Sequence, residues 1–167
     1  MTIKVGDRIP AAAVKRRVNG AIEEVATEAF FAGRKVVLVG MPGAFTPTCS
    51  GRHLPGYVEQ AEALKAEGAD AIAVMSVNDP FVMEAWGKEQ GVGDKVVMLA
   101  DAEAEFTCAL GLEAQMPPQA GLGLRTRRFA LVADQGVVTH LAIETQPGLD
   151  LSAAEKVIAA MRAARGR

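Results

Sequence analysis

The sequence predicts an α/β fold in which helices flank a central mixed sheet. From residue 35 onward, apolar runs typical of buried strands alternate with amphipathic segments typical of helices, which indicates parallel β-α-β units. The C-terminal part instead indicates two strands joined by a tight turn and followed by a helix. We expect the 167 residues to form a single domain, since a domain of this length buries most of its apolar surface.

The N-terminal part is expected to form a β-hairpin that extends the sheet. Asn19-Gly20 lies between β-favouring residues in VKRRVNGAIEEV, and this dipeptide favours a type I′ turn. The apolar run KVVLVG at 35–40 then predicts a buried strand.

The next helices are predicted from their apolar spacing and their caps. Residues 54–67 carry apolar side chains at helical spacing, and residues 70–77 indicate the buried strand that follows. Asp79 and Pro80 begin a further helix as N-cap and first-turn proline. The side chains expected to face the core are Leu54, Tyr57, Val58, Ala61 and Leu64 in the first helix and Phe81, Val82, Ala85 and Trp86 in the second.

The remaining elements complete the sheet. The strand KVVML ends at Ala100, a short helix is expected over 103–112, and a loop containing PPQAGLG follows. RRFALVAD and VVTHLAI form a hairpin about Gln135-Gly136, and Ser152 with Glu155 forms a capping box that starts the last helix. The inner face of that helix is expected to carry Ala154, Val157, Ile158 and Met161. A parallel β-α-β half followed by an antiparallel β-β-α half matches the thioredoxin-like fold.

Composition and motifs argue against several classes of function. The formal net charge of -2 gives no electrostatic footprint for nucleic acid. The apolar runs are far shorter than the roughly 20 residues that span a bilayer, and MTIKVGDRIP lacks the apolar segment of a secretory signal, so we expect a cytoplasmic protein. Two isolated histidines are too few for a metal cage, and GLGLR at 121–125 lacks Walker or Rossmann spacing, so no metal or cofactor is expected.

The stretch GMPGAFTPTCSGRHLPG at 40–56 carries the candidate chemistry. Thr46 can cap a helix and Pro47 suits its first position, which places Cys49 in the first turn. The N–H groups and the dipole of that turn favour the thiolate, which is the nucleophilic form of cysteine. A free cysteine often serves only for packing, but Cys49 follows a polar, proline-punctuated turn rather than lying on an apolar face.

The same stretch resembles a known active-site motif. Pro42-Gly43-Ala44-Phe45-Thr46-Pro47-Thr48-Cys49 resembles the P-x-x-x-T-x-x-C motif of peroxiredoxins. SGRHLPGY at 50–57, VNDPFVMEAW at 77–86 and RRFALVAD at 127–134 resemble, in order and spacing, the type II or peroxiredoxin-5-like subfamily. The resemblance runs from about residue 3 to residue 162. It implies a homodimeric thiol peroxidase of thioredoxin-like fold that reduces hydrogen peroxide and alkyl hydroperoxides.

The resemblance also implies roles for individual residues. Cys49 would be the peroxidatic cysteine, whose thiolate attacks a peroxide oxygen and becomes a sulfenic acid. Thr46 would hydrogen-bond peroxide and thiolate, and Pro42 would shield the pocket. Arg128 would stabilise the thiolate and orient the peroxide. The backbone N–H groups from Gly43 to Cys49 are further candidate donors.

Other readings of the charged residues stay open. Arg127 and Arg128 are adjacent on a predicted strand and so point to opposite faces, and without the resemblance both would be surface residues. His53, four residues after Cys49, either supports the thiolate from the next turn or satisfies a backbone group. His140 is expected on the sheet surface.

Pro55 suggests that the turn carrying Cys49 is weakly coupled to its helix. It has no N–H to donate to the carbonyl of residue 51, and its ring clashes with that carbonyl. The result is either a simple kink or a turn that unwinds locally and exposes oxidised Cys49 to a reducing partner.

Reduction of the sulfenic acid needs a thiol. Where members of the subfamily often carry a resolving cysteine, this chain has Val74 and Leu151. The second thiol, Cys108 in EFTCALGL, is expected to be partly exposed, because Phe106, Ala109 and Leu110 mark the inward side of its helix. Cys108 is either a resolving cysteine or an incidental thiol. We favour a one-cysteine cycle with glutathione and glutaredoxin, or thioredoxin, as electron donor.

Two other functions fit the same fold. A thiol–disulfide oxidoreductase normally has C-x-x-C, but Cys49-Ser50-Gly51-Arg52 has no second sulfur. A non-enzymatic binding or chaperone module would tolerate Cys49→Ser without loss of activity, whereas a peroxidase would lose turnover.

Overall fold

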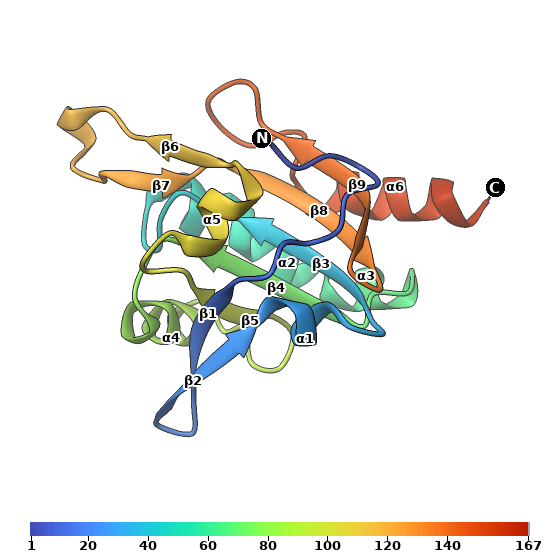
Figure 1. The fold of residues 1–167 in the computed structure, drawn as a ribbon, viewed down its shortest axis with the longest axis horizontal. Helices are drawn as coiled ribbons and strands as arrows, with labels where there is room; N and C mark the ends of the chain where they lie inside the picture. Colours follow the sequence, from blue (N-terminus) through green and yellow to red (C-terminus); the bar gives the residue numbers. More distant parts are fainter. Residues whose placement is uncertain (167) are drawn as a thin grey trace.

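The structure, a computed structural model, describes residues 1–166 and is built on a seven-stranded mixed sheet (Figure 1). The strands of this sheet are β1 (Ala13–Val18), β2 (Ala21–Ala26), β3 (Lys35–Gly40), β4 (Ala71–Ser76), β5 (Val97–Ala100), β8 (Phe129–Asp134) and β9 (Val137–Ile143). The helices are α1 (Thr27–Phe31), α2 (Leu54–Glu59), α3 (Ala61–Ala66), α4 (Pro80–Glu89), α5 (Glu105–Leu110) and α6 (Ala154–Arg165). Among the described residues, no helix is long and apolar enough to cross a membrane.

The strand order β2-β1-β5-β4-β3-β8-β9 confirms the thioredoxin-like fold. β3 runs parallel to β4, and β4 parallel to β5, which is the predicted β-α-β half. β8 pairs antiparallel with β3, and β9 with β8, which is the predicted β-β half. The N-terminal hairpin β1–β2 extends the sheet beyond β5.

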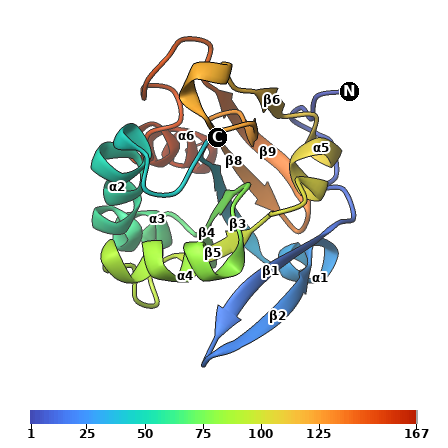
Figure 2. The same ribbon diagram turned by 90° about the vertical axis from the view of Figure 1, so that its left-hand side faces the viewer.

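Helices cover both faces of the sheet (Figure 2). Val37 and Val39 of β3 point into a core that α2, α3, α4 and α6 complete. Val36 and Leu38 point to the other side, where α1 and α5 cover the sheet with side chains such as Phe106. Because the central strands are buried on both faces, they read as unbroken apolar runs in the sequence.

Both predicted hairpin turns have the backbone that a type I′ turn needs. The φ values are 50° at Asn19 and 80° at Gly20, and 50° at Gln135 and 82° at Gly136. Positive φ at both central positions matches the right-handed twist of the flanking strands. These local signals therefore predicted the turns correctly.

Several predicted details are wrong because tertiary partners override the local pattern. The helix predicted over 54–67 is interrupted at Gln60, where ψ is 8°. Phe81 and Ala85 of α4 are exposed, and the buried side of that helix carries Pro80, Met83, Trp86 and Gly87. Phe81 instead lies against the guanidinium of Arg17, with 4.7 Å between Cζ and the ring centroid. Ala109 of α5, expected to face inward, is also exposed.

The expected capping box of the last helix does not form. Ala153 holds the N-cap position of α6, and no side chain caps the helix. The hydroxyl of Ser152 donates to Glu144 at 2.6 Å instead. A carboxylate from the end of β9 thus replaces Glu155 as the partner of Ser152.

A short helix and a small second sheet were not predicted. The short helix α1 follows the hairpin directly. The region read as a loop after residue 112 forms a small two-stranded antiparallel sheet, β6 (Glu113–Gln115) and β7 (Leu124–Thr126), with a 3-10 turn at Pro118–Ala120. Strands of three residues are too short to show an alternating pattern in sequence.

The junction between β3 and the loop that follows depends on a glycine. Gly40 pairs with Phe129 of β8, and a Cβ at position 40 would overlap the buried ring of Phe129. We expect Gly40→Ala to lower the free energy of unfolding by roughly 1–3 kcal/mol, because a packed core cannot absorb an added methyl without strain. Urea denaturation measures the change.

Gly56→Ala in α2 is the matched control. A Cβ there would meet nothing within 4 Å, so alanine should stabilise the helix by about 0.5–1 kcal/mol. Equal effects of the two substitutions on stability would refute the close packing of Gly40 on Phe129.

Candidate active site

Cys49 lies just beyond the carboxyl end of β3, in a helical segment that begins at Pro47. Its side chain is free and fully buried, with 0% of its surface exposed. The placement of Pro47 at the first helical position and of Cys49 in the first turn is therefore confirmed. Donor groups that converge on the sulfur here act in a site from which water is largely excluded.

The turn that carries the cysteine is a π-helix over Cys49–His53. The N–H of Leu54 donates to the carbonyl of Cys49, five residues back. Pro55 has no N–H for residue 51, and the wider turn accommodates this missing hydrogen bond. Single π turns of this kind are frequent at functional sites.

Helix α4 anchors this π turn from the side. Trp86 Nε1 donates to the hydroxyl of Ser50 at 2.9 Å, and Gln90 Nε2 donates to the Ser50 carbonyl at 3.1 Å. The indole of Trp86 is fully buried. Sequence analysis assigned Trp86 to the core alone, but it also fixes the residue next to Cys49.

Arg128 reaches the sulfur. It precedes β8 by one residue, rather than lying within the predicted strand, and its Nη2 donates to Cys49 Sγ at 3.4 Å. Its Nη1 contacts His53 Nδ1 at 2.8 Å. The neighbouring Arg127 is held elsewhere, since its N–H donates to the carbonyl of Leu112 at 2.7 Å. The guanidinium thus joins cysteine and histidine.

The partners of His53 assign its tautomer. Arginine only donates, so Nδ1 must accept from Arg128, and Nε2 therefore carries the proton and donates to the carbonyl of Ser152 at 3.1 Å. Burial, followed by the positive charge of Arg128, lowers the pKa of His53 to about 4. The imidazole, only 1% exposed, is therefore neutral near pH 7 and binds Arg128 without opposing its charge.

The loop before the cysteine is fixed through its backbone. The hydroxyl of Thr46 donates to the carbonyl of Gly43 at 2.6 Å, so it does not cap the helix as expected. The carbonyl of Thr46 accepts from the N–H of Ser50 at 2.9 Å. The N–H of Ala44 is taken by Asn78 Oδ1 at 3.0 Å, which removes one of the candidate backbone donors.

Arg125 of β7 holds the other side of this loop. Its Nη1 donates to the carbonyl of Pro42 at 3.2 Å, and its Nε donates to the carbonyl of Leu122 at 2.8 Å. A Cβ on Gly43 would lie 2.9 Å from Nη1 of Arg125 and 3.0 Å from Cγ2 of Thr46, so only glycine fits without displacing them. Sequence analysis missed Arg125, because only the fold brings β7 to this loop.

The structure does not bring Cys108 to Cys49. Cys108 is exposed on α5, which covers the opposite face of the sheet (Figure 2). A disulfide needs Cα atoms within about 7 Å of each other, and here the sheet lies between the two residues. Slight desolvation of this exposed thiol, followed by the negative charges of Glu113 and Asp101, raises the pKa of Cys108 and so disfavours its reactive form.

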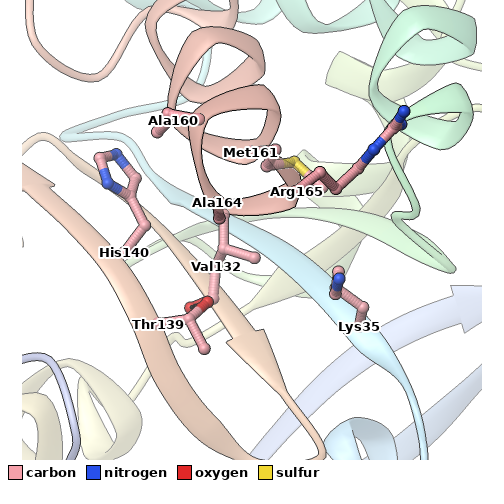
Figure 3. A pocket seen from close by; sticks show the side chains of 9 residues that line it. Lys35, Val132, Thr139, His140, Ala160, Met161, Ala164 and Arg165 are labelled. Carbon is pink, nitrogen blue, oxygen red and sulfur yellow. Dashed lines mark hydrogen bonds between the residues drawn. The ribbon is translucent and has the colours of Figure 1, made fainter. Parts of the chain in front are cut away.

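His140 also lies apart from Cys49. It lines a pocket of about 260 Å³ between β8, β9 and α6, together with Lys35 at the start of β3 (Figure 3). Cys49 follows the other end of that strand. His140 is half-buried rather than on the sheet surface, and its Nε2 has no hydrogen-bond partner among residues 1–166.

The buried imidazole predicts a titration well below the ordinary range. Burial keeps His53 neutral in the fold, whereas an unfolded histidine titrates near pH 6.5. The unfolded chain therefore binds more protons between about pH 4 and 6.5, so stability falls as the pH drops through this window, by roughly 3 kcal/mol in total. NMR titration of the imidazole protons should give a midpoint for His53 at about pH 4.

His53→Gln assigns the signals, because it leaves only those of His140. A midpoint for His53 at or above the ordinary histidine value would contradict the buried, neutral imidazole.

Comparison with known proteins identifies the family of this chain. The Redoxin family matches residues 4–158. The chain is 47% identical over 164 residues to peroxiredoxin-2E-2, chloroplastic, of Oryza sativa subsp. japonica, covering 96% of this chain and 73% of that protein. It is 43% identical over 160 residues to peroxiredoxin-2B of Arabidopsis thaliana, covering 95% and 98%.

A solved structure shows the same fold and a similar sequence. Reduced Prx3 of Vibrio vulnificus in complex with hydrogen peroxide aligns with a TM-score of 0.92 and 45% identity, over 96% of this chain and 99% of that one. Family match, identity and fold thus agree with the cysteine-centred site. The chain belongs to the type II peroxiredoxins, which are thiol peroxidases.

Proposed function

We propose that this chain reduces hydrogen peroxide and alkyl hydroperoxides at Cys49 and is returned to the thiol by an external thiol reductant. One observation carries the proposal: a guanidinium donates to the buried sulfur at 3.4 Å and is itself held by a neutral imidazole at 2.8 Å. A fixed positive charge beside sulfur favours the thiolate. The Vibrio vulnificus structure, solved with hydrogen peroxide, supports the same substrate class here.

The proposed chemical step is a displacement at oxygen. The thiolate of Cys49 attacks one oxygen of the peroxide ROOH, and a sulfur–oxygen bond forms as the oxygen–oxygen bond breaks. The enzyme keeps the HO group as Cys49–SOH, and RO⁻ leaves and takes up a proton from water to become an alcohol or water. Arg128, at the sulfur, can donate to the leaving oxygen while its charge builds up.

Residues of the loop before Cys49 can bind the peroxide and limit access to the sulfur. Because the Thr46 hydroxyl donates to the Gly43 carbonyl, its oxygen lone pairs are available to accept a hydrogen bond from the peroxide. Pro42 and Thr46 are both half-buried beside fully buried Cys49, which suits a narrow opening that limits access to the sulfur. These roles follow the P-x-x-x-T-x-x-C motif.

Turnover is proposed to use one cysteine of the chain. A thiol of the reductant attacks the sulfenic sulfur and releases water, which leaves a mixed disulfide on Cys49. A second thiol of the reductant then attacks the reductant sulfur of this mixed disulfide. Cys49 is released as the thiolate, and the reductant is left oxidised as a disulfide. Glutathione with glutaredoxin, or thioredoxin, would supply these thiols. The position of Cys108 beyond the sheet favours this cycle over an internal disulfide.

We also propose a homodimer that forms on the side of the active-site loop. Phe45 in that loop is 51% exposed, and Phe81 at the start of α4 is 57% exposed. The ring of Phe45 lies 6.4 Å from that of Trp86, so the exposed side chain of Phe45 adjoins the helix that anchors the π turn. Burial of such side chains against a second copy would stabilise a symmetric interface.

Replacement of Arg128 tests the proposed role of the guanidinium. We expect Arg128→Gln to lower kcat/KM for hydrogen peroxide by roughly 10- to 100-fold, because charge-assisted hydrogen bonds contribute about 1.5–3 kcal/mol. Arg127→Gln is the control, since Arg127 differs by one position but has no contact with Cys49. Similar losses in both variants would count against a specific role for Arg128.

Replacement of each cysteine tests the one-cysteine cycle. Cys108→Ser should keep steady-state peroxidase activity with the glutaredoxin or thioredoxin system, and Cys49→Ser should have none. Non-reducing mass spectrometry after equimolar peroxide should find a sulfenic acid on Cys49. A Cys49–Cys108 disulfide would overturn the cycle, and full activity of Cys49→Ser would overturn the peroxidase assignment.

A further inference from the structure

Glu144 forms an unusually dense set of hydrogen bonds just beyond β9. Its Oε2 accepts from the N–H of Asp150 at 3.0 Å and from the N–H of Ser152 at 2.8 Å, and its Oε1 accepts from the N–H of Leu151 at 3.1 Å. Oε2 also accepts from the hydroxyl of Ser152 at 2.6 Å. One carboxylate therefore closes the loop 145–151, which is mostly exposed and has no helix or strand of its own.

The loop that Glu144 closes ends at the carbonyl that binds His53. The carbonyl of Ser152 accepts from Tyr57 Oη at 2.6 Å and from His53 Nε2 at 3.1 Å. Both donors lie on the same side of the helix that follows Cys49, four residues apart. This one carbonyl is therefore the fixed acceptor for the Nε2 proton of His53.

A second contact ties Glu144 to Arg128 directly. The N–H of Glu144 donates to the carbonyl of Arg128 at 3.0 Å, next to the β8–β9 ladder. Residue 144 thus holds the backbone of Arg128 through its own backbone, and reaches the side chain of Arg128 through Ser152 and His53. Both routes end at Arg128, the first at its backbone carbonyl and the second at Nη1, and Nη2 of the same guanidinium donates to Cys49 Sγ.

We propose that Glu144 is a positioning residue for the reaction at Cys49. Its carboxylate holds the carbonyl of Ser152 where it accepts the Nε2 proton of His53, and this leaves Nδ1 free to accept from Arg128. The guanidinium is then fixed with its other nitrogen at the sulfur. The inference rests on the proposed function for its effect on activity, but the tautomer of His53 can be measured independently.

The chemistry of the partners requires a carboxylate at position 144. All four bonds to its side chain come from N–H or O–H donors, and a carboxylate offers only acceptors. In glutamine, an NH₂ group replaces one of the two carboxylate oxygens. This NH₂ group donates hydrogen bonds and would face N–H or O–H groups that also donate. Burial alone would raise the pKa of Glu144, but the hydrogen bonds from Ser152, Asp150 and Leu151 outweigh it, and the pKa lies below its usual value.

Loss of the carboxylate has a defined consequence at the imidazole. Once the carbonyl of Ser152 moves away, the Nε2 proton of His53 has no fixed acceptor, and the Nδ1–H tautomer becomes accessible. That tautomer cannot accept from Arg128, because an N–H group would face a guanidinium N–H. The guanidinium then loses one of the partners that hold it at Cys49.

Glu144→Gln tests the proposal by activity and by spectroscopy. We expect kcat/KM for hydrogen peroxide to fall about tenfold, which corresponds to the loss of a charge-assisted hydrogen bond. Ser152→Ala, which removes only the hydroxyl contact, should give a smaller fall in the same direction. NMR spectra of the imidazole nitrogens of His53 should show only the Nε2–H tautomer in the wild type and a mixture of tautomers in Glu144→Gln.

Asp150→Asn is the matched control, because it removes a negative charge from the same loop. Within residues 1–166, the one polar contact of the Asp150 carboxylate is with Lys156, at 3.6 Å, and the side chain is largely exposed, so activity and tautomer should stay unchanged. The proposal is overturned if Glu144→Gln keeps wild-type kcat/KM and a pure Nε2–H tautomer, or if Asp150→Asn causes the same loss.

The outcome is separable from that of the proposed function. If Glu144→Gln does not fold, Ser152→Ala alone decides, and a wild-type tautomer and activity in that variant would overturn the proposal. If the wild type lacks peroxidase activity, the proposed function fails, and the tautomer of His53 still decides whether Glu144 positions it.

Discussion

The guanidinium of Arg128, placed between a buried sulfur and a neutral imidazole, is the interaction on which the site depends. A half-buried positive charge next to two fully buried side chains needs partners that satisfy its donors without adding charge of the same sign. Cys49 and His53 do this at 3.4 Å and 2.8 Å. Burial keeps the imidazole unprotonated, so that both ring nitrogens have defined roles and the arginine side chain has few alternative positions.

The sheet explains why residues so far apart in sequence meet. β3 and β8 are antiparallel neighbours, and their register pairs Gly40 with Phe129. The residue before Phe129 therefore lies beside the segment that follows Gly40, which leads to Cys49. Parallel pairing of β3 with β4 places Asn78 at the same edge, where it binds the N–H of Ala44. The site thus forms where the carboxyl ends of two strands meet the start of a third.

Local signals in the sequence predicted what depends on neighbours along the chain, and failed where distant partners compete. The type I′ turns, the Asp79 cap and the position of Cys49 after Pro47 all follow from a few adjacent residues. The hydroxyls of Thr46 and Ser152, expected to cap helices, instead bind Gly43 and Glu144. Arg128 was placed at the site by resemblance to a family, because spacing alone could not relate it to Cys49. Arg125, Glu144 and the β6–β7 ribbon had no local signal at all.

The π turn over Cys49–His53 contains one residue more than an α-helical turn would. If this turn became α-helical, it would need one residue fewer. The preceding loop would then be longer by that residue, which corresponds to about 1.5 Å of axial rise. The cysteine would then travel outward while Leu54 and the rest of α2 stay packed on the sheet. The oxidised sulfur would become accessible through a local shift in the hydrogen-bond register of this turn. The hydrogen bonds from Trp86 and Gln90 to Ser50 would have to break first.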